Sequence, residues 1–360
     1  MMSVDTRKLK IEAIELLTQL IGTPSISRKE DKTADLISDF LTKRGIQVNR
    51  KFNNIWAVNA NHSGKKDPTI LLNSHHDTIK PGENWATDPF SAWREEDKII
   101  GLGSNDAGAS AVSLISTFIY LSRLPRLRYK LILTITAEEE ISGERGVKAV
   151  LPELGSIDWG IVGEPTRMQV AVAEKGLIVL DCMAHGKSGH AARDEGVNAL
   201  YIALDDIHWL RKYKFEKVSD LLGPLKLTVT QIQGGIQHNV VPDLCSFVVD
   251  IRTNDLYSNE EVITLIREEI SSEISPRSYH LNSSRIDPEH PIVKKAQALG
   301  RKIFGSPTLS DQSVMSFPTI KMGPGDSLRS HAPNEYILSS EIEEGIDLYI
   351  RLLENFSHPL

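Results

Sequence analysis

The stretch TILLNSHHD, from Thr69 to Asp77, is an apolar run that ends in polar and titratable residues. Apolar and β-branched residues followed at once by imidazoles and a carboxylate are typical of a buried strand whose end carries functional groups. In extended backbone, side chains two residues apart share a face, so His75 and Asp77 point together and His76 points away. A histidine beside a carboxylate suits a metal ligand and its orienting partner. Taken alone, the pair is more typical of a structural hydrogen bond.

Other apolar runs on both sides of this stretch predict the fold class. Short runs occur at residues 55–58, 131–136 and 160–163, and an uncharged helix is predicted over 107–122. Strands separated by a long helix predict an α/β fold with a mixed, mostly parallel sheet covered by helices.

The middle of the chain follows a different pattern. Strands are predicted at 177–184, 225–233, 244–251 and 279–284, and helices at 198–213 and 259–272. This β-α-β-β-α-β order predicts an inserted α+β ferredoxin-like sandwich. We therefore expect residues 1–175 and 286–360 to form one discontinuous domain, and residues 176–285 to form a second.

Composition and charge exclude several classes of protein. The 360 residues include 41 Lys and Arg against 48 Asp and Glu, a net charge of −7, which disfavours nucleic acid as a partner. The uncharged run 107–122 is too short for a membrane span, and the N-terminus lacks the apolar stretch of a signal peptide. The two cysteines, Cys182 and Cys245, are expected to be free and buried, so we expect a cytoplasmic protein.

Four further motifs place candidate ligands at junctions between predicted elements. Asp106 lies in a glycine-flanked turn, GLGSNDAG, where it suits either a metal-bridging carboxylate or a helix N-cap. The run Glu138-Glu139-Glu140 ends an apolar strand, where it suits either a metal and proton-transfer site or a solvated turn. Glu164 is held extended by the following proline, and His331 lies in a loop.

The motifs together favour a metal site over five unrelated structural roles. The carboxyl ends of neighbouring strands in an open α/β sheet meet at one edge, so these side chains are expected to lie close together. Two histidines and three carboxylates without a cysteine fit a pair of divalent cations, most simply zinc, with cobalt as the alternative.

The five motifs in this order, with an insert of about 110 residues, resemble the dinuclear zinc acylamino-acid hydrolases. That family includes acetylornithine deacetylase, succinyl-diaminopimelate desuccinylase, aminoacylase and the glutamate carboxypeptidases, and the resemblance covers essentially the whole chain. It implies that Asp106 bridges two metals, with His75 and Glu164 on one and Glu140 and His331 on the other. It further implies that Glu139 is the general base, that Asp77 orients His75, and that the Asp106–Ala107 peptide is cis. The run of three acids leaves the register of Glu139 and Glu140 open by one residue.

The insert carries matches of its own. In GKSGHAA, His190 resembles the family histidine that reaches the partner protomer's site, although a surface-loop histidine is the simpler alternative. Asn239 resembles a substrate-contacting asparagine, and Arg252 resembles the arginine that pairs with a substrate carboxylate. A structural salt bridge is the alternative for Arg252. The backbone at Gly325 is expected to approach the substrate. The resemblance makes the outer domain catalytic and the insert a lid and dimerisation domain.

The function expected from this resemblance is metal-dependent hydrolysis of an N-acyl amino acid by a homodimer. Within the family, the sequence motifs are most similar to those of acetylornithine deacetylase. This similarity implies that the substrate is N-acetyl-L-ornithine, or a related N-acetyl or N-succinyl derivative of ornithine or citrulline, and that the reaction belongs to arginine biosynthesis. Desuccinylase and dipeptidase activities are alternatives, as is an aminopeptidase. A non-catalytic binding protein on the same fold is disfavoured because every ligand position holds a competent residue.

Overall fold

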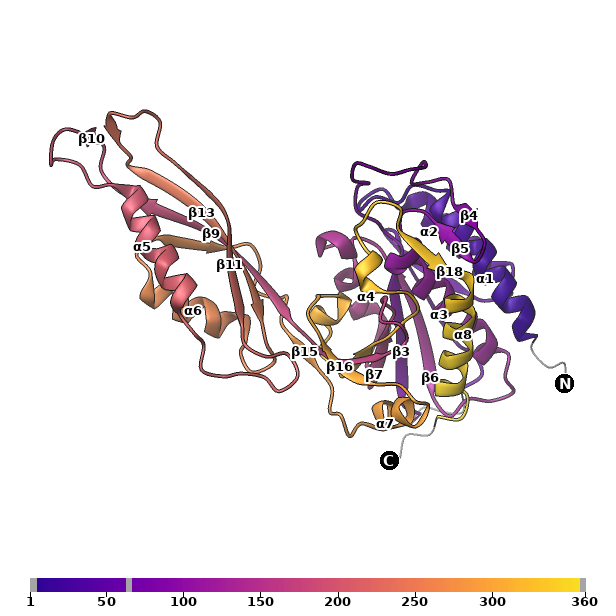
Figure 1. The fold of residues 1–360 in the computed structure, drawn as a ribbon. Helices are drawn as coiled ribbons and strands as arrows, with labels where there is room; N and C mark the ends of the chain where they lie inside the picture. The colour runs from indigo at the N-terminus through magenta and orange to yellow at the C-terminus, as the bar shows by residue number, and fades with distance from the viewer. Residues whose placement is uncertain (1–4, 63–66, 357–360) are drawn as a thin grey trace. The chain divides into compact units, whose positions relative to one another are not determined.

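The chain forms two units that are continuous in space but not in sequence. The computed structural model describes residues 5–62 and 67–356. One compact unit comprises Met1–Val172, Ile286–Phe304 and Ser310–Leu360, and the other comprises Ala173–Arg285 and Gly305–Leu309 (Figure 1). The second unit is therefore an insertion into the first. Two strands, β8 (Val170–Glu174) and β16 (Ile303–Ser306), include residues of both units.

The first unit is a layered α/β structure. Its helices are α1 (Thr6–Ile21), α2 (Asp31–Thr42), α3 (Ala109–Ser122), α4 (Val147–Leu154), α7 (Pro291–Ala298) and α8 (Ser339–Leu353), with short helical segments η1 (Ser104–Gly108), η2 (Glu139–Ile141), η3 (Asp311–Val314) and η4 (Ser327–Arg329). Its strands are β1 (Val48–Lys51), β2 (Asn54–Val58), β3 (Thr69–His75), β4 (Trp93–Glu95), β5 (Lys98–Ile100), β6 (Lys130–Thr136), β7 (Trp159–Val162), β17 (Thr319–Lys321) and β18 (Tyr336–Leu338).

The central sheet confirms the mixed α/β architecture. In the described part of the chain its strand order is β1-β2-β6-β3-β7-β17-β8-β15, with β16 also paired to β8. The pairs at the centre, β6 with β3, β3 with β7 and β7 with β17, are parallel, whereas β1 with β2, β2 with β6 and β17 with β8 are antiparallel. Every residue of β3 is buried, as expected for a parallel strand covered on both faces.

Helices cover both faces of this sheet. On one face α3 packs between α1 and α8 (Figure 1). On the other, Val150 and Leu154 of α4 pack against Leu71 and Ile132. The uncharged sequence of α3 is explained by this position, because almost all of its residues are buried.

The second unit is an antiparallel sheet with two helices. Its elements are β9 (Gly176–His185), β10 (Gly189–His190), α5 (Ala199–Lys212), β11 (Lys226–Gly234), β12 (Val240–Val241), β13 (Leu244–Thr253), α6 (Asn259–Glu269), β14 (Glu273–Pro276) and β15 (Ser284–Arg285). The strand order is β11-β13-β9-β14, and α5 and α6 pack on the sheet over a common core. Burial alternates along β9 and β13, so one face is covered and the other is open. This is the ferredoxin-like arrangement expected from the sequence.

The last strand of the insert differs from the sequence-based prediction. The fourth strand of the insert is β14 at 273–276 rather than at 279–284, because the chain leaving α6 reaches the free edge of β9 immediately. After the insert, α7 ends at Ala298, and Gly300 adopts a positive φ of 80° just before β16.

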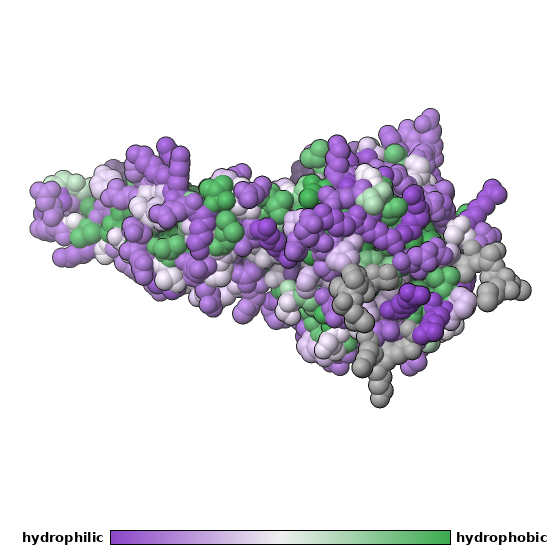
Figure 2. Space-filling model, turned by 90° about the horizontal axis from the view of Figure 1, so that it is seen from below, coloured by the Kyte–Doolittle hydropathy of each residue, from purple (hydrophilic) through white to green (hydrophobic). Residues whose placement is uncertain are grey.

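The surface has ordinary composition on the face seen in Figure 2, where hydrophobic side chains are scattered among hydrophilic ones. No helix within the described residues combines the length and the apolar character needed to cross a bilayer.

Candidate metal centre

The candidate ligands meet at one edge of the central sheet because three parallel strands end there. His75 is the last residue of β3, Glu139 and Glu140 follow β6, and Glu164 follows β7. β3 pairs in parallel with both β6 and β7, and His75 lies opposite Thr136. These side chains therefore lie close together because the carboxyl ends of adjacent parallel strands meet at this edge, as expected from the sequence.

Asp106 is brought to the same edge by a tight turn at the start of α3. Gly103 has a positive φ of 75°, and a Cβ on Gly108 would lie 2.4 Å from the Gly103 carbonyl oxygen, so both glycines are needed for this turn. The Asp106–Ala107 peptide is cis, which confirms that expectation.

The distances between candidate ligand atoms are short. His75 Nε2 lies 3.3 Å from Asp106 Oδ1, 3.8 Å from Glu164 Oε1 and 3.9 Å from Glu139 Oε2. His331 Nε2 lies 2.9 Å from Glu140 Oε2 and 3.6 Å from Asp106 Oδ2. The two oxygens of Asp106 thus face two different histidines, which is the arrangement that a bridging carboxylate requires.

These groups fit divalent cations. Ligand atoms that share one tetrahedral zinc at bond lengths of about 2.0–2.1 Å lie about 3.3 Å apart, close to several of the separations above. Two sets have ligand atoms mutually within 4.8 Å, one of His75, Asp106 and Glu140 and one of His75, Glu139 and Glu164. The His75 tautomer also fits, because Nδ1 donates to the Asp77 carbonyl oxygen at 3.0 Å and leaves Nε2 for a metal.

The electrostatics of the cluster reflect an excess of buried acid. Burial raises the pKa of Glu164 to about 8 and holds the pKa of Glu139 well above its usual range. The hydrogen bond to Glu140 raises the pKa of His331 to about 9. Burial acts to lower the pKa of His75, but the hydrogen bond to Asp106 and the surrounding carboxylates outweigh it and raise the pKa. Cations bound among these groups would remove the repulsion that keeps protons on the acids.

Asp77 supports the turn that carries the two glutamates. Its carboxylate accepts the backbone N–H groups of Glu139 at 3.0 Å and Glu140 at 3.2 Å, and the Ser27 hydroxyl at 2.7 Å. The Asp77 side chain is almost fully enclosed, so this support is rigid. The three acids of the run therefore have different partners: Glu138 accepts the Arg145 N–H, Glu139 lies near His75, and Glu140 contacts His331.

Several residues that build the centre carry no signal in the sequence. Glu335 Oε1 accepts the backbone N–H groups of Asn105 at 2.8 Å and Asp106 at 3.0 Å and so fixes the bridging turn. Burial raises the pKa of Glu335 to about 8. Asp311 Oδ2 accepts from the Asn73 amide at 2.8 Å and from the Thr136 hydroxyl at 2.7 Å beneath the ends of β3 and β6.

Gly325 lies against the turn that carries Asn105 and Asp106, and not in open space. It has a positive φ of 89°, and a Cβ there would lie 2.3 Å from Asn105 Oδ1. The absence of a side chain at Gly325 thus allows Asn105 to bond the backbone of Asp326. Its approach to substrate stays a prediction.

The candidates in the insert are described within their own unit. His190 of β10 is exposed and pairs with Val240 of β12, and the N–H of Ala191 donates to the Asn239 carbonyl oxygen at 3.0 Å. The Asn239 side-chain oxygen is buried without a hydrogen-bond partner among the described residues. His190 and Asn239 are therefore brought together, and their functional roles stay predictions.

Arg252 is engaged within its own strand. Its Nε and Nη2 donate to the two carboxylate oxygens of Asp250 at 2.9 and 3.0 Å. This bidentate pair is the structural alternative considered from the sequence, and substrate binding by Arg252 stays a prediction.

The chain is similar to known proteins in sequence and in fold. The sequence model of Peptidase family M20/M25/M40 matches residues 71–355. A succinyl-diaminopimelate desuccinylase of Orientia tsutsugamushi (strain Boryong) is 28% identical over 288 residues, covering 75% of this chain and 74% of that protein. An acetylornithine deacetylase of Proteus mirabilis (strain HI4320) is 28% identical over 383 residues, covering 95% and 96%. The structure of the Bacillus subtilis YXEP protein, described as a dinuclear metal-binding peptidase of the M20 family, aligns with a TM-score of 0.76 at 17% identity, covering 97% of this chain and 100% of that one.

Proposed function

The chain belongs to peptidase family M20/M25/M40, and we propose that this amidohydrolase cleaves the amide bond of an N-acyl amino acid. The observation that carries the proposal is the position of Glu139. Its carboxylate lies at the edge of the ligand cluster, 3.9 Å from His75 Nε2, while Asp77 holds its backbone N–H. With the ligand positions filled by the other residues of the proposed set, a carboxylate fixed beside the metal site is the arrangement that a general base in amide hydrolysis needs.

The proposed ligand set is the one implied by the sequence. Asp106 would bridge two divalent cations, with His75 and Glu164 on one and Glu140 and His331 on the other. The chemistry that such cations supply, when bound, is polarisation of a carbonyl and acidification of water. Zinc is the proposed metal, because imidazole and carboxylate ligands without thiolate suit it, and cobalt is the alternative.

Glu139 has two successive tasks in this proposal. It takes a proton from the water that attacks the acyl carbonyl carbon, and it returns that proton to the amine as the C–N bond breaks. Water and amide are thereby converted to a carboxylate and a free amino acid with no other reactant.

The proposed substrate is N-acetyl-L-ornithine or a related N-acetyl or N-succinyl derivative of ornithine or citrulline, which would place the reaction in arginine biosynthesis. The similarity to an acetylornithine deacetylase along 95% of the chain supports this substrate. The similarity to a succinyl-diaminopimelate desuccinylase supports N-succinyl-diaminopimelate to the same degree, so it is the second candidate. Free, buried Cys182 and Cys245 support a reducing cytoplasm as the compartment.

We further propose that the enzyme acts as a homodimer through its insert. Large apolar side chains are exposed there, among them Tyr201 at 67%, Leu204 at 52% and Ile236 at 89%. Exposed apolar side chains gathered on one domain are typical of an interface. In such a dimer His190 would donate a hydrogen bond to the oxyanion that forms at the partner's site.

The decisive experiment measures amine release from N-acetyl and N-succinyl forms of ornithine, citrulline, lysine and diaminopimelate, with zinc and with chelator. Cleavage of one acyl amino acid that needs metal is the expected result, and the preferred compound identifies the acyl group. Cleavage of dipeptides or free-amine peptide amides, with all acyl amino acids left intact, would overturn the proposed substrate class.

A further inference from the structure

His331 is the most exposed of the five proposed metal ligands. The side chains of the other four are between 1% and 14% exposed, whereas that of His331 is 53% exposed. It lies in loop 326–335, the segment from Asp326 through η4 to Glu335. Little packing surrounds an imidazole this exposed, so its position depends on how loop 326–335 is attached to the rest of the first unit.

Asn105 attaches the first part of this loop to the turn that carries Asp106. The Asn105 residue is fully buried. Its Nδ2 donates to the Asp326 carbonyl oxygen and to the Ser330 hydroxyl, both at 3.1 Å, and its Oδ1 accepts the Asp326 N–H at 2.9 Å. Both donors and the acceptor of the amide are therefore engaged, and all three bonds join the residue before Asp106 to residues that precede His331.

Glu335 attaches the other end of the loop to the same turn. Its Oε1 accepts the N–H groups of Asn105 at 2.8 Å and Asp106 at 3.0 Å, and its carbonyl oxygen accepts the Gly101 N–H at 2.9 Å. His331 therefore lies between two attachments to one turn, residues 101–106. The bonds to Glu335 hold the backbone of Asp106 itself, whereas those of the Asn105 side chain hold the residues that lead into His331.

The first attachment depends on an amide at position 105. An aspartate there would accept the Asp326 N–H but could not donate to the Asp326 carbonyl oxygen or to Ser330, and an alanine would form none of the three bonds. The loop approaches this closely only because residue 325 is glycine, since a Cβ on Gly325 would lie 2.3 Å from Asn105 Oδ1. The contact thus depends on residue choices at two positions that are far apart in the sequence.

We propose that Asn105 is a positioning residue that holds His331 opposite Asp106 and thereby keeps one of the two proposed cations bound. His331 Nε2 lies 3.6 Å from Asp106 Oδ2, and the Asn105 amide joins the segments that carry these two ligands. Hydrogen-bonded partners of metal ligands typically contribute a factor of about 10–100 in metal affinity, because they fix the orientation of the ligand. The proposal rests on the ligand set of the proposed function but does not depend on the substrate.

The effect of this attachment is expected to be confined to one cation. In the proposed set, the first cation is held by His75 and Glu164, which lie at the ends of β3 and β7 and not in loop 326–335. The second cation takes His331 from this loop. The bridging Asp106 keeps its hydrogen bond to Glu335 when the amide is removed. Removal of the amide is therefore expected to weaken binding of the second cation and to spare the first.

Zinc titration of the metal-free full chain, in competition with a chromophoric chelator, tests the proposal. The wild-type chain is expected to bind two zinc ions. Asn105→Ala is expected to raise one of the two dissociation constants at least about tenfold and to change the other by less than about twofold. Equal weakening of both constants, or wild-type constants in the variant, would overturn the proposal.

His331→Ala identifies which cation responds. This variant removes a proposed ligand of the second cation, so the number of zinc ions bound is expected to fall towards one. The double substitution Asn105→Ala/His331→Ala is expected to bind zinc as His331→Ala alone does, because a residue that acts through His331 has no further effect once the imidazole is gone. A further loss of affinity in the double variant would show that Asn105 does not act through His331.

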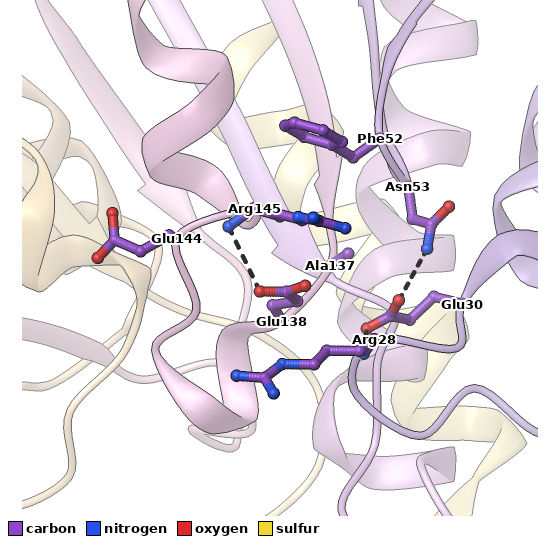
Figure 3. Close-up of a pocket in the computed structure, with 8 residues that line it drawn as sticks. All are labelled: Arg28, Glu30, Phe52, Asn53, Ala137, Glu138, Glu144 and Arg145. Carbon is purple, nitrogen blue, oxygen red and sulfur yellow. Dashed lines mark hydrogen bonds between the residues drawn. The ribbon is translucent and has the colours of Figure 1, made fainter.

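The matched control removes an asparagine amide from a different part of the first unit. Asn53 donates to the buried Glu30 at 2.9 Å in a cavity that Glu138 also lines (Figure 3). The residues drawn around this cavity lie in segments 28–30, 52–53 and 137–145. Asn53→Ala therefore removes a side-chain hydrogen bond outside loop 326–335 and is expected to change neither dissociation constant by more than about twofold. Thermal unfolding of each variant shows whether the fold is retained.

The remaining outcomes separate this proposal from the proposed function. A wild-type chain that binds two zinc ions but cleaves no acyl amino acid would overturn the proposed function and leave the role of Asn105 intact. A wild-type chain that binds fewer than two zinc ions would overturn the ligand set and, with it, this proposal. If Asn105→Ala does not fold, Ser330→Ala decides, because it removes only one of the three bonds. A rise of about threefold in the constant that His331→Ala affects is then expected, and no change would overturn the proposal.

Discussion

Glu139 and Glu140 are adjacent and chemically identical, and their different positions come from the backbone. Asp77 binds the N–H groups of both, which fixes the turn and directs Glu140 to His331 and Glu139 to the neighbourhood of His75. These contacts support Glu140 as the proposed ligand and Glu139 as the proposed base, and the register of the two stays a prediction. Residue identity alone does not distinguish a ligand from a base.

Substitution of each glutamate separates the two roles. Glu139→Gln is expected to lower kcat by about 10³-fold, since proton transfer contributes factors of this order, while metal content stays at the wild-type level. Glu140→Gln is the matched control, and it is expected to lower metal content because it removes a proposed ligand. Metal content comes from elemental analysis and kcat from amine release. An active Glu139→Gln enzyme would contradict the role of this residue.

Metal loading is expected to release protons. In the metal-free protein the pKa values of about 8 for Glu164 and about 9 for His331 mean that both groups hold protons at pH 7. Metal ligation requires the deprotonated forms, so binding must displace at least one proton, and affinity must rise from pH 7 towards pH 9. Zinc titration in buffers of different ionisation enthalpy measures this release. Affinity that is constant over this range would contradict the assignment of these ligands.

At the scale of elements, a buried hydrogen-bond network beneath the metal centre links strand ends to a distant segment. Asn73 of β3 and Thr136 of β6 both donate to Asp311 of η3, and Thr134 donates to the Asn73 side-chain oxygen at 2.6 Å. The network ties β3 and β6 together directly beneath His75 and the turn of Glu139. We expect these hydrogen bonds to position the strand ends.

Removal of Asp311 tests this network. Asp311→Ala leaves the Asn73 amide and the Thr136 hydroxyl unpaired in the interior, so it is expected to lower the free energy of unfolding by about 2 kcal/mol. Asp311→Asn keeps an oxygen that can accept both donors and is expected to cost less than about 1 kcal/mol. Denaturant unfolding measures both. Equal losses for the two variants would show that the hydrogen bonds are not what stabilises this region.

The network also shows which parts of the site the sequence could predict. His75, Glu164 and the Glu138–Glu140 run directly follow apolar strands, and a strand end is a local signal that places a side chain at the sheet edge. Asp311 and Glu335 lack such a signal, because their partners Asn73 and Asn105 lie more than 200 residues away in the chain. The fourth strand of the insert differs from the prediction for a related reason: an edge strand is selected by the free edge of β9 and not by its own apolar run.

At the scale of the whole molecule, the insertion divides the first unit in sequence without dividing it in space. Asp106 and Glu140 precede the insert and His331 follows it, yet Asp106 Oδ2 and His331 Nε2 lie 3.6 Å apart. The insert is folded on its own hydrophobic core. The proposed role in a dimer is that it brings His190 to a second copy of the chain.

Coexpression of two inactive variants tests whether His190 acts across subunits. Chains with Glu139→Gln keep His190, and chains with His190→Ala keep Glu139, so each homodimer lacks one group at both sites. Random pairing makes half of the dimers mixed, and in a mixed dimer one of the two sites receives Glu139 from one chain and His190 from the other. The coexpressed enzyme is therefore expected to recover about one quarter of the wild-type kcat per site, compared with almost none in either homodimer. If His190 acted on its own chain, no site in a mixed dimer would hold both groups, and activity would not recover.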